Sequence, residues 1–383
     1  MKAYLDNSAT TMPSKKVKNE MNDFLNISYG NPSSLHDLGI IAERRIKKAK
    51  KNIANDLKCS GKEIVFTSGG TESNNLAIIG YALKNKNKGN HLITTTYEHK
   101  SVLNSFKYLE SIGFNVTYLS VGSQGEIKRE DLKDKLTDET ILVSIMHINN
   151  EVGTMNPIET FGKIIKEYSN QIVFHVDGVQ SFGKFKINLK NIDLFSFSAH
   201  KVHGIKGIGG LYINSEISIS NLHYGGQQEN GIRPGTENLL GIVSLNAALE
   251  EAVETRKETF DYVKKLKEKL SRFIIKNIED TKINVESYET SPYILSVSFK
   301  DMMSEVLLHD LESKNIFVST GSACNSKSKS NSYVLESMNI EDEYIGGTIR
   351  FSFSKNNTVE EIDYVCESLE TSVKSIRKII QRR

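Results

Sequence analysis

Short apolar runs alternate with longer amphipathic stretches over most of the first 240 residues. The short runs are rich in β-branched and aromatic residues and are bounded by turn residues, which predicts strands. Amphipathic helices are expected between several of them, for example over 101–112 and 158–168. Because strands and helices alternate, we expect an α/β fold with a mostly parallel sheet covered on both faces. The expected strands span 63–67, 91–95, 116–120, 141–145, 172–176 and 194–198.

A long helical pattern follows this alternating part of the chain. Apolar side chains recur at helical spacing between residues 239 and 278. The apolar seam is too short to favour a coiled coil, so we interpret the segment as a helix that links two domains and packs on both. Further on, 293–299 and 349–353 alternate like half-buried antiparallel strands. A last helix is expected from Glu360 onward.

The charge balance argues against some classes of partner. The 383 residues include 49 Lys and Arg against 47 Asp and Glu, a formal net charge of +2. That balance gives no electrostatic reason to expect direct binding of nucleic acid or of an anionic membrane. The N-terminal residues lack the apolar segment of a signal peptide, and no stretch approaches the roughly 20 apolar residues of a membrane span. We therefore expect a soluble cytoplasmic protein.

The three cysteines differ in their surroundings. They are too few and too widely spaced for a disulfide framework, and no Cys-x-x-Cys pair suggests zinc. Cys324 stands in a run of small residues followed by a stretch rich in Ser, Lys and Asn. A structural cysteine usually has apolar neighbours, so we interpret Cys324 as an exposed, catalytic thiol. Cys59 is interpreted as a helix-end residue and Cys366 as a packing residue.

A candidate phosphate site follows the expected strand 63–67. Two glycines, Gly69 and Gly70, precede Thr71 and the start of a helical pattern. The free N–H groups and the dipole of a helix N-terminus favour an anion there. An ordinary capped turn with Thr71 as the N-cap explains the same residues equally well. Both interpretations stay open on this segment alone.

Two charged residues emerge from buried strands further along the chain. Asp177 follows 172–176, where a carboxylate can cap a helix or keep a ring nitrogen protonated. Lys201 follows 194–198 after Ala199 and His200. A lysine held in a desolvated pocket can have a lowered pKa and form a Schiff base. Because strand carboxyl ends gather at one edge of a parallel sheet, Asp177, Lys201 and the phosphate site together match the requirements of pyridoxal phosphate.

Histidines accompany these strand ends. His200 and His203 offer only two nitrogens, with no acidic or thiol partner close in sequence, so we expect no metal site there. His99 follows another strand, and it is either a satisfied loop histidine or a residue that lies against a planar cofactor and moves protons.

The chain resembles the class V aminotransferase-like family, and within it the cysteine desulfurases of the NifS/IscS type. The resemblance covers essentially the whole chain. It is carried by Tyr4-Leu-Asp-Asn-Ser-Ala-Thr-Thr, Gly30-Asn-Pro-Ser-Ser-Leu-His, Ser68-Gly-Gly-Thr-Glu-Ser-Asn-Asn, Glu98-His-Lys, Asn149-Asn-Glu-Val-Gly, His175-Val-Asp-Gly-Val-Gln-Ser, Ser198-Ala-His-Lys, Arg233-Pro-Gly-Thr-Glu-Asn and Gly321-Ser-Ala-Cys.

The resemblance implies a fold-type I transferase that depends on pyridoxal 5′-phosphate. Its large domain, with a mostly parallel seven-stranded sheet between helices, would span 14–258. A smaller α+β domain, formed by 1–13 and 259–383, would carry the loop of the catalytic cysteine.

The resemblance also implies roles for single residues. Lys201 would hold the cofactor, Cys324 would receive the sulfur as a persulfide, and His99 would stack on the ring and act in catalysis. Asn150 and Arg350 would bind the substrate, the arginine through a bidentate carboxylate contact. Asp177 would pair with the ring nitrogen and Gln180 with the ring hydroxyl. The phosphate would be held by Gly70, Thr71, Ser198 and His200. Thr236 would reach the phosphate from the partner subunit of a homodimer. Asn150 is also expected to contact the cofactor.

The implied reaction converts L-cysteine to L-alanine and delivers the sulfur to an acceptor protein, such as an iron–sulfur scaffold or a tRNA-thiolation enzyme. The long loop around Cys324 is similar to that of the group serving general iron–sulfur assembly. Ile205 stands where the family usually has proline, and the segment after Cys324 is more basic than in many relatives. A selenocysteine lyase would use the same site. A class V aminotransferase would need no thiol, and a sulfur-carrier or scaffold protein would leave Lys201 and Asp177 unexplained.

Overall fold

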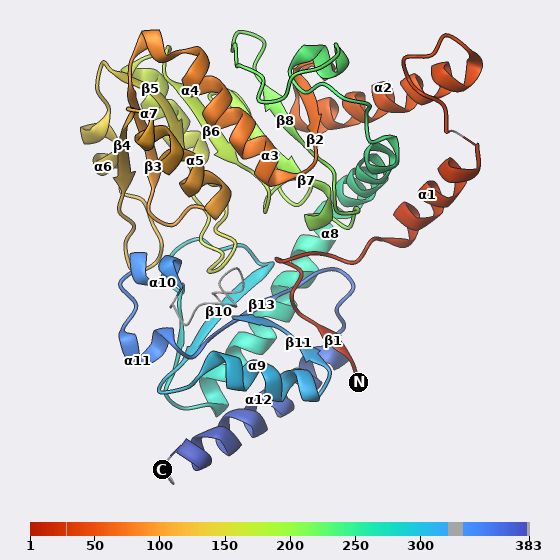
Figure 1. The fold of residues 1–383 in the computed structure, drawn as a ribbon. Coiled ribbons are helices and arrows are strands. Elements are labelled where there is room, and N and C mark those ends of the chain that lie inside the picture. The colour runs from red at the N-terminus through yellow and green to blue at the C-terminus, as the bar shows by residue number, and fades with distance from the viewer. Residues whose placement is uncertain (28, 321–331, 381–383) are drawn as a thin grey trace.

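The computed structural model describes residues 1–27, 29–320 and 332–380. A seven-stranded sheet forms the centre of the larger part of the molecule (Figure 1). All its strands run in one direction except β8, which pairs antiparallel with β2 and β7. The order across the sheet is β2 (Ile64–Thr67), β8 (Gly209–Ile213), β7 (Leu194–Ser198), β6 (Val173–Asp177), β5 (Thr140–Ser144), β3 (His91–Thr95) and β4 (Asn115–Leu119).

The predicted α/β class and the mostly parallel sheet are confirmed. Each of the six strands expected from apolar runs is present, with its ends within one residue of the prediction. The pattern of apolar runs did not indicate β8, because this strand begins with two glycines. A Cβ on Gly210 would lie 2.3 Å from the Phe197 ring on the neighbouring strand, so close packing requires the glycine that hides the strand signal.

Helices cover both faces of the sheet. Successive strand residues alternate between two apolar clusters; Phe66 and Ile93 face one cluster, and Val65 and Leu92 face the other. The first face is covered by α1 (Lys15–Ile27), α2 (Asp37–Leu57), α6 (Arg129–Lys135), α7 (Ile158–Tyr168) and the start of α8. The second is covered by the helical run α3 (Gly70–Asn75), η2 (Leu76–Gly80) and α4 (Tyr81–Lys84), together with α5 (Lys100–Ser111).

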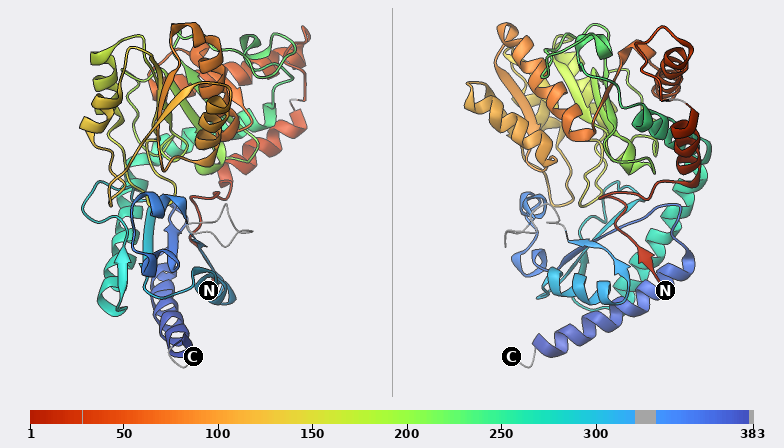
Figure 2. Two further views of the ribbon diagram at one scale, coloured as in Figure 1. Left: turned by 60° about the vertical axis from the view of Figure 1, so that its left-hand side comes forward. Right: turned by 45° about the vertical axis from the view of Figure 1, so that its right-hand side comes forward.

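A single helix, α8 (Leu239–Asn277), runs from the larger part of the molecule into the smaller one (Figures 1 and 2). Its first half packs into the cluster around Ile242 and Leu245, and its second half packs into a separate cluster around Leu266 and Leu270. This confirms the prediction of one helix that packs on both parts. The boundaries 14–258 and 1–13 with 259–383 remain a prediction.

The smaller part contains a four-stranded antiparallel sheet. Its order is β12 (Ser319–Thr320), β13 (Thr348–Ser352), β10 (Ile294–Phe299) and β9 (Thr281–Ile283). The remaining elements here are β1 (Ala3–Tyr4), β11 (Ile316–Phe317), α9 (Ser304–Ser313), α10 (Tyr333–Ser337), α11 (Asp342–Ile345) and α12 (Val359–Ile380). In the described part of the chain, no helix combines the length and the apolar character needed to cross a membrane.

The prediction that 293–299 and 349–353 are half-buried strands was wrong on burial, because both strands are buried on both faces. The alternating serines of β10 are satisfied inside the protein. Ser298 Oγ donates to Asn284 Oδ1 at 2.9 Å and lies 2.6 Å from Thr348 Oγ1. Internal hydrogen bonds therefore replace the solvent that a serine at these positions would otherwise need.

The N-terminal segment connects the two parts. Strand β1 pairs with β11 in the smaller part, while α1 packs on α8 in the larger part. Figures 1 and 2 show the intervening residues crossing from one part to the other. These crossing residues, 4–11, lie beside the carboxyl end of the seven-stranded sheet, where they contact Lys201 and Gln180.

Candidate functional site

A cavity of about 330 Å³ lies beside the carboxyl ends of β6 and β7. This is the edge where ligands bind in open parallel sheets. The predicted residues Gly70, Thr71, His99, Asn150, Asp177, Gln180, Ser198, His200, Lys201 and Arg350 all line it. The structure therefore brings together residues from five strand ends, the smaller part and the crossing segment.

Lys201 ends a 3-10 turn, η4 (Ala199–Lys201), that directly follows β7. Its Nζ donates to the main-chain oxygens of Ser8 at 2.6 Å and of Ala9 at 2.7 Å. A carbonyl oxygen only accepts hydrogen bonds, so the crossing segment holds the amine by its hydrogens and fixes its position in the cavity.

Asp177 is the last residue of β6 and is buried. Its Oδ1 accepts from the backbone N–H of Val179 at 3.0 Å, and its Oδ2 accepts from Asn74 Nδ2 at 2.8 Å. Two donors therefore fix the orientation of this carboxyl group, which lines the cavity where it could pair with a protonated ring nitrogen.

The Asn74 amide also reaches His99 through a serine. Asn74 Nδ2 donates to Ser101 Oγ at 2.9 Å, and Ser101 Oγ lies 2.8 Å from His99 Nδ1. The backbone N–H of Ser101 also donates to His99 Nδ1, at 3.1 Å. Because Nδ1 is an acceptor, the network assigns the proton of the neutral ring to Nε2.

His99 is the N-cap of α5. Burial lowers its pKa below the ordinary value, and the positive charges of Lys201 and Lys100 act in the same direction, whereas the Asp177 charge opposes them. The ring caps a helix through Nδ1 and lines the cavity, while its stacking on a cofactor and its role in proton transfer stay predictions.

The glycine turn before α3 has the N-cap at Gly69, with φ of +152° and no side-chain cap. The alternative in which Thr71 caps the helix was wrong, because the helix already begins at Gly70. A Cβ on Gly70 would lie 2.6 Å from Val179 Cγ2. The first N–H groups of a helix have no partner within it, so they are available to an anion at this edge of the cavity.

Gln180 and His200 are both held by the crossing segment. Gln180 Nε2 donates to the main-chain oxygen of Ser8 at 3.1 Å, and His200 Nδ1 lies 3.2 Å from Thr10 Oγ1. Burial, followed by nearby lysines, lowers the pKa of His200 to about 4, so its ring is neutral. His203 turns to the main-chain oxygen of Met12, at 3.0 Å. Within the described ranges, no group of three or more potential metal ligands is found.

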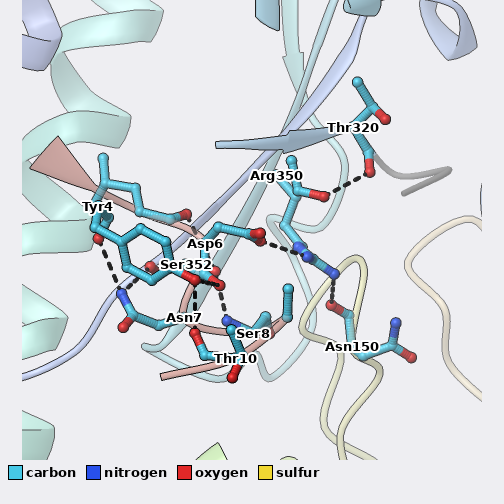
Figure 3. Close-up of polar contacts among 12 residues, drawn as sticks. Tyr4, Asp6, Asn7, Ser8, Thr10, Asn150, Thr320, Arg350 and Ser352 are labelled. Carbon is cyan, nitrogen blue, oxygen red and sulfur yellow. Dashed lines mark hydrogen bonds and ion pairs between the residues drawn. The ribbon is translucent and has the colours of Figure 1, made fainter. Parts of the chain in front are cut away.

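Arg350 reaches the cavity from β13 in the smaller part (Figure 3). Its Nη1 donates to the main-chain oxygen of Asn150 at 2.8 Å, and its Nη2 pairs with Asp6 Oδ1 at 2.8 Å. The residue is 4% exposed. Both predicted substrate-binding residues are therefore joined to each other, and Asp6 is an additional partner.

Two predicted residues lie outside this arrangement. Thr236 is exposed and does not line the cavity of its own chain. Its assignment to a partner subunit stays a prediction. Cys324 lies outside the described residues.

The cysteines that the structure does describe are buried or half-buried free thiols. Cys59 directly follows the C-cap of α2, and Cys366 packs in the core of the smaller part, as predicted. Burial raises the pKa of each to about 12, so neither is a nucleophile at neutral pH.

The departure at Ile205 has a local structural explanation. Its backbone N–H donates to Ser244 Oγ on α8 at 2.9 Å. A proline here would have no such donor, so isoleucine adds a link between this turn and α8.

Buried polar atoms without partners gather around the cavity. Among the described residues, Ser198 Oγ, Asn150 Oδ1, Arg350 Nε and Asn74 Oδ1 are buried with no hydrogen-bond partner, and all four residues line the cavity. Each such atom costs free energy unless a ligand satisfies it. These unpartnered donors and acceptors, together with Lys201 and Asp177, fit pyridoxal phosphate, which brings a phosphate, an aldehyde and a ring nitrogen.

The chain belongs to the aminotransferase class-V family, whose model matches residues 3–365. This family consists of pyridoxal-phosphate enzymes, in agreement with the residues of the cavity.

More specific similarity comes from individual proteins. Cysteine desulfurase IscS of Clostridium botulinum is 43% identical over 380 residues, covering 98% of this chain and 95% of that protein. Cysteine desulfurase IscS of Buchnera aphidicola is 44% identical, with coverages of 98% and 94%. Among solved structures, a NifS-like protein has a TM-score of 0.92 at 39% identity, covering 98% of this chain and all of the other. SspA in complex with cysteine has a TM-score of 0.81 at 36% identity, covering 93% of this chain and all of SspA.

Some residues of the site were not predicted from the sequence. Asp6, Ser8 and Ala9 lie in the motif Tyr4–Thr11, which carried the resemblance without a role for any of its residues. Asn74 and Ser101 were indicated only as polar residues near helix starts. The available signal was weak: Ser101 lies two residues after His99, and Asn74 lies three residues after Thr71.

Proposed function

We propose that the protein is a pyridoxal-phosphate-dependent cysteine desulfurase, which converts L-cysteine to L-alanine and an enzyme persulfide on Cys324. The observation that carries this proposal is the set of buried, unpartnered polar atoms around Lys201 and Asp177. The similarity to proteins named cysteine desulfurase over almost the whole chain supports the choice of reaction.

The residues of the cavity divide between the parts of the cofactor. Ser198, His200 and the start of α3 would hold the phosphate, Asp177 the ring nitrogen, and Gln180 the ring hydroxyl. Lys201 would hold the aldehyde carbon. When bound, pyridoxal phosphate supplies an electron sink for reactions at the substrate α-carbon.

The substrate would be oriented by the side of the cavity that faces the smaller part. Arg350 has an unpartnered Nε and would donate to the α-carboxylate, with the Asn150 side chain beside it. The amine of Lys201, held by the Ser8 and Ala9 oxygens, would move the proton at the α-carbon. The neutral ring of His99, with its proton on Nε2, would exchange a second proton in the cavity.

Cys324 would receive the sulfur. Its thiolate would form an S–S bond with the sulfur of L-cysteine while the Cβ–S bond of the substrate breaks, leaving alanine and a persulfide. The high pKa of Cys59 and of Cys366 supports this choice of cysteine. The persulfide would pass to an acceptor protein such as an iron–sulfur scaffold or a tRNA-thiolation enzyme.

The assembly that fits these assignments is a cytoplasmic homodimer in which Thr236 of one subunit completes the phosphate site of the other. The exposure of Thr236 outside its own cavity supports this arrangement.

The test measures alanine and protein-bound persulfide after incubation of the purified protein with L-cysteine. Cys324→Ala should keep the visible absorbance of the bound cofactor and lose the persulfide, whereas Lys201→Ala should lose the absorbance of the lysine-bound cofactor. Cys59→Ala is the matched control and should retain the persulfide. Persulfide formation by Cys324→Ala at the native rate would remove the thiol from the mechanism.

Two further outcomes would favour other functions. Turnover of selenocysteine much faster than that of cysteine would indicate a selenocysteine lyase. Transfer of the amino group to a 2-oxo acid, without release of sulfur, would indicate an aminotransferase.

A further inference from the structure

Arg350 is held at two of its three nitrogens. Nη1 donates to the main-chain oxygen of Asn150 and Nη2 pairs with Asp6 Oδ1, each at 2.8 Å, whereas Nε is buried and has no partner (Figure 3). A guanidinium has five N–H donors in a rigid plane. Fixing the two Nη atoms therefore fixes the direction in which Nε and the remaining donors point.

Asp6 is itself placed by the strand that carries Arg350. It forms a parallel bridge with Ser352, two residues along β13, and the neighbouring backbone bonds join Leu5 to Ser352 and Ser8 to the Ser352 hydroxyl. Asn7 Nδ2 donates to the main-chain oxygen of Ser352 at 2.9 Å. Both members of the ion pair thus have their backbones fixed to one another.

The environment makes this ion pair different from those on the surface. The side chain of Arg350 is 5% exposed and that of Asp6 is 22% exposed. Asp6 does not line the cavity, whereas Arg350 does. The carboxylate of Asp6 therefore meets the cavity through the guanidinium that it contacts.

We propose that Asp6 is a positioning residue that orients the Arg350 guanidinium, with its Nε edge unpaired, for the carboxylate of an amino-acid substrate. The inference deepens the proposed function and rests on its assignment of the substrate carboxylate to Arg350. A carboxylate that accepts from Nε and from the second hydrogen of Nη2 would make the parallel pair of bonds that arginine forms best, and Asp6 would remain in place.

The experiment compares ligands with and without a carboxylate. L-cysteine and L-alanine carry one, and cysteamine has the amine and the thiol alone. Binding is measured from the change in visible absorbance of the holoenzyme, and kcat and KM for L-cysteine are measured in parallel. Asp6→Asn keeps the size of the side chain and removes its charge.

Asp6→Asn should weaken binding of L-alanine and raise KM for L-cysteine by about tenfold, as expected for loss of one charge-assisted contact. The change in kcat should be smaller, and the affinity for cysteamine should stay the same. Asp6→Glu should recover part of the loss. Asp363→Asn is the matched control, because it breaks an exposed ion pair with Lys269 in the same part of the molecule. It should leave the affinity for both ligands unchanged.

If Asp6→Asn weakens the binding of L-alanine and of cysteamine equally, the role of Asp6 is structural only and the proposal is overturned. The proposal is also overturned if the variant weakens the binding of neither ligand. Arg350→Lys separates this failure from failure of the proposed function. If Arg350→Lys loses the preference for carboxylate ligands while Asp6→Asn keeps it, the inference about Asp6 alone is wrong. If neither variant changes the preference, the carboxylate assignment in the proposed function is wrong as well.

Discussion

Asp177 and His99 are joined by an unbroken chain of hydrogen bonds that passes through Asn74 and Ser101, with each link between 2.8 and 2.9 Å. The amide of Asn74 donates both of its hydrogens, one to Asp177 and one to Ser101. Ser101 Oγ must then use its own hydrogen toward His99 Nδ1. The network thereby fixes the carboxylate and the imidazole relative to each other on two sides of the cavity.

Removing the Ser101 hydroxyl should disturb His99, because this hydroxyl lies 2.8 Å from Nδ1 of the ring. A donor to Nδ1 favours the neutral ring, so we expect Ser101→Ala to move the pKa of His99 up toward its ordinary value. The acidic limb of the pH profile of kcat/KM should move to higher pH, and kcat/KM near pH 7 should fall about fivefold. Ser101→Thr keeps a hydroxyl and is the control. Identical pH profiles for the alanine and threonine variants would contradict the proposed relay.

Ser198→Ala should have opposite effects on the protein with and without its cofactor. Ser198 Oγ is buried with no partner among the described residues, so its removal should raise the free energy of unfolding of the apoprotein by up to about 1 kcal/mol. Affinity for pyridoxal phosphate should fall about tenfold. Ser196→Ala is the control on the same strand: its hydroxyl lies 3.0 Å from His175 Nε2, and its loss should destabilise the apoprotein. Thermal unfolding and cofactor titration measure both effects.

Gly70→Ala should weaken cofactor binding by crowding the cavity. The added methyl group would lie 2.6 Å from Val179 Cγ2, and both residues line the cavity, so relieving this contact must change the wall of the cavity. We expect roughly tenfold weaker binding, restored in large part by the double variant with Val179→Ala. Gly61→Ala places its methyl group at an ordinary 3.6 Å from Lys50 and should change nothing. Failure of the double variant to recover affinity would point away from the steric cause.

Buried neutral histidines should make the protein sensitive to acid. Burial lowers the pKa of His175 to about 3 and that of His147 to about 4, against an ordinary value near 6.5. At these two histidines the unfolded chain binds more protons between pH 4 and 6.5, so their contribution to the free energy of unfolding should rise with pH and then level off. Urea unfolding across this range measures the slope. His147→Gln should flatten it, and an unchanged slope in this variant would contradict the assignment.

Two buried carboxyl groups should act in the opposite direction at higher pH. Burial raises the pKa of Glu98 to about 8 and that of Glu151 to about 7. The folded protein therefore holds these protons where the unfolded chain has released them, and stability falls as the pH rises from about 4.5 through these values. The histidines and these carboxyl groups oppose each other between about pH 4.5 and 6.5, whereas above pH 6.5 the carboxyl groups act alone and stability falls. Glu98→Gln should reduce the decline between pH 6.5 and 8, whereas Glu312→Gln, which changes an exposed group, should leave it unchanged.

Much of the fold was predictable because the strands of the main sheet, except the edge strand β4, are buried on both faces. Such strands appear as continuous apolar runs, and six were located to within a residue. The one that was missed, β8, begins with glycines that its neighbour Phe197 requires, so the packing removed the local signal. The burial of β10 was also missed, because its serines pair with Asn284 and Thr348, and such partners are set by tertiary contacts alone.

The site was predictable where a residue follows a strand directly. Asp177 and Lys201 were recognised in this way, since the carboxyl ends of parallel strands must meet. The role of Asp6 could not be recognised in this way. Its partner Arg350 is 344 positions away and belongs to the four-stranded sheet, not to the seven-stranded one. Asn74 was likewise hidden, because its amide acquires a role only once α3 lies against both β6 and α5.

The bond between Asp6 and Arg350 also constrains how the protein can be made. Asp6 is among the first residues to leave the ribosome. Its partner Arg350 lies in β13, the last strand of the described chain, which is complete only at Ser352. Until then Asp6 lacks its two partners on β13, the bridge to Ser352 and the ion pair with Arg350. Closure of the site is therefore a long-range event of high contact order, which should come late in folding. A polypeptide halted before β13 would contain Lys201 and Asp177 but have no means of completing the cavity around them.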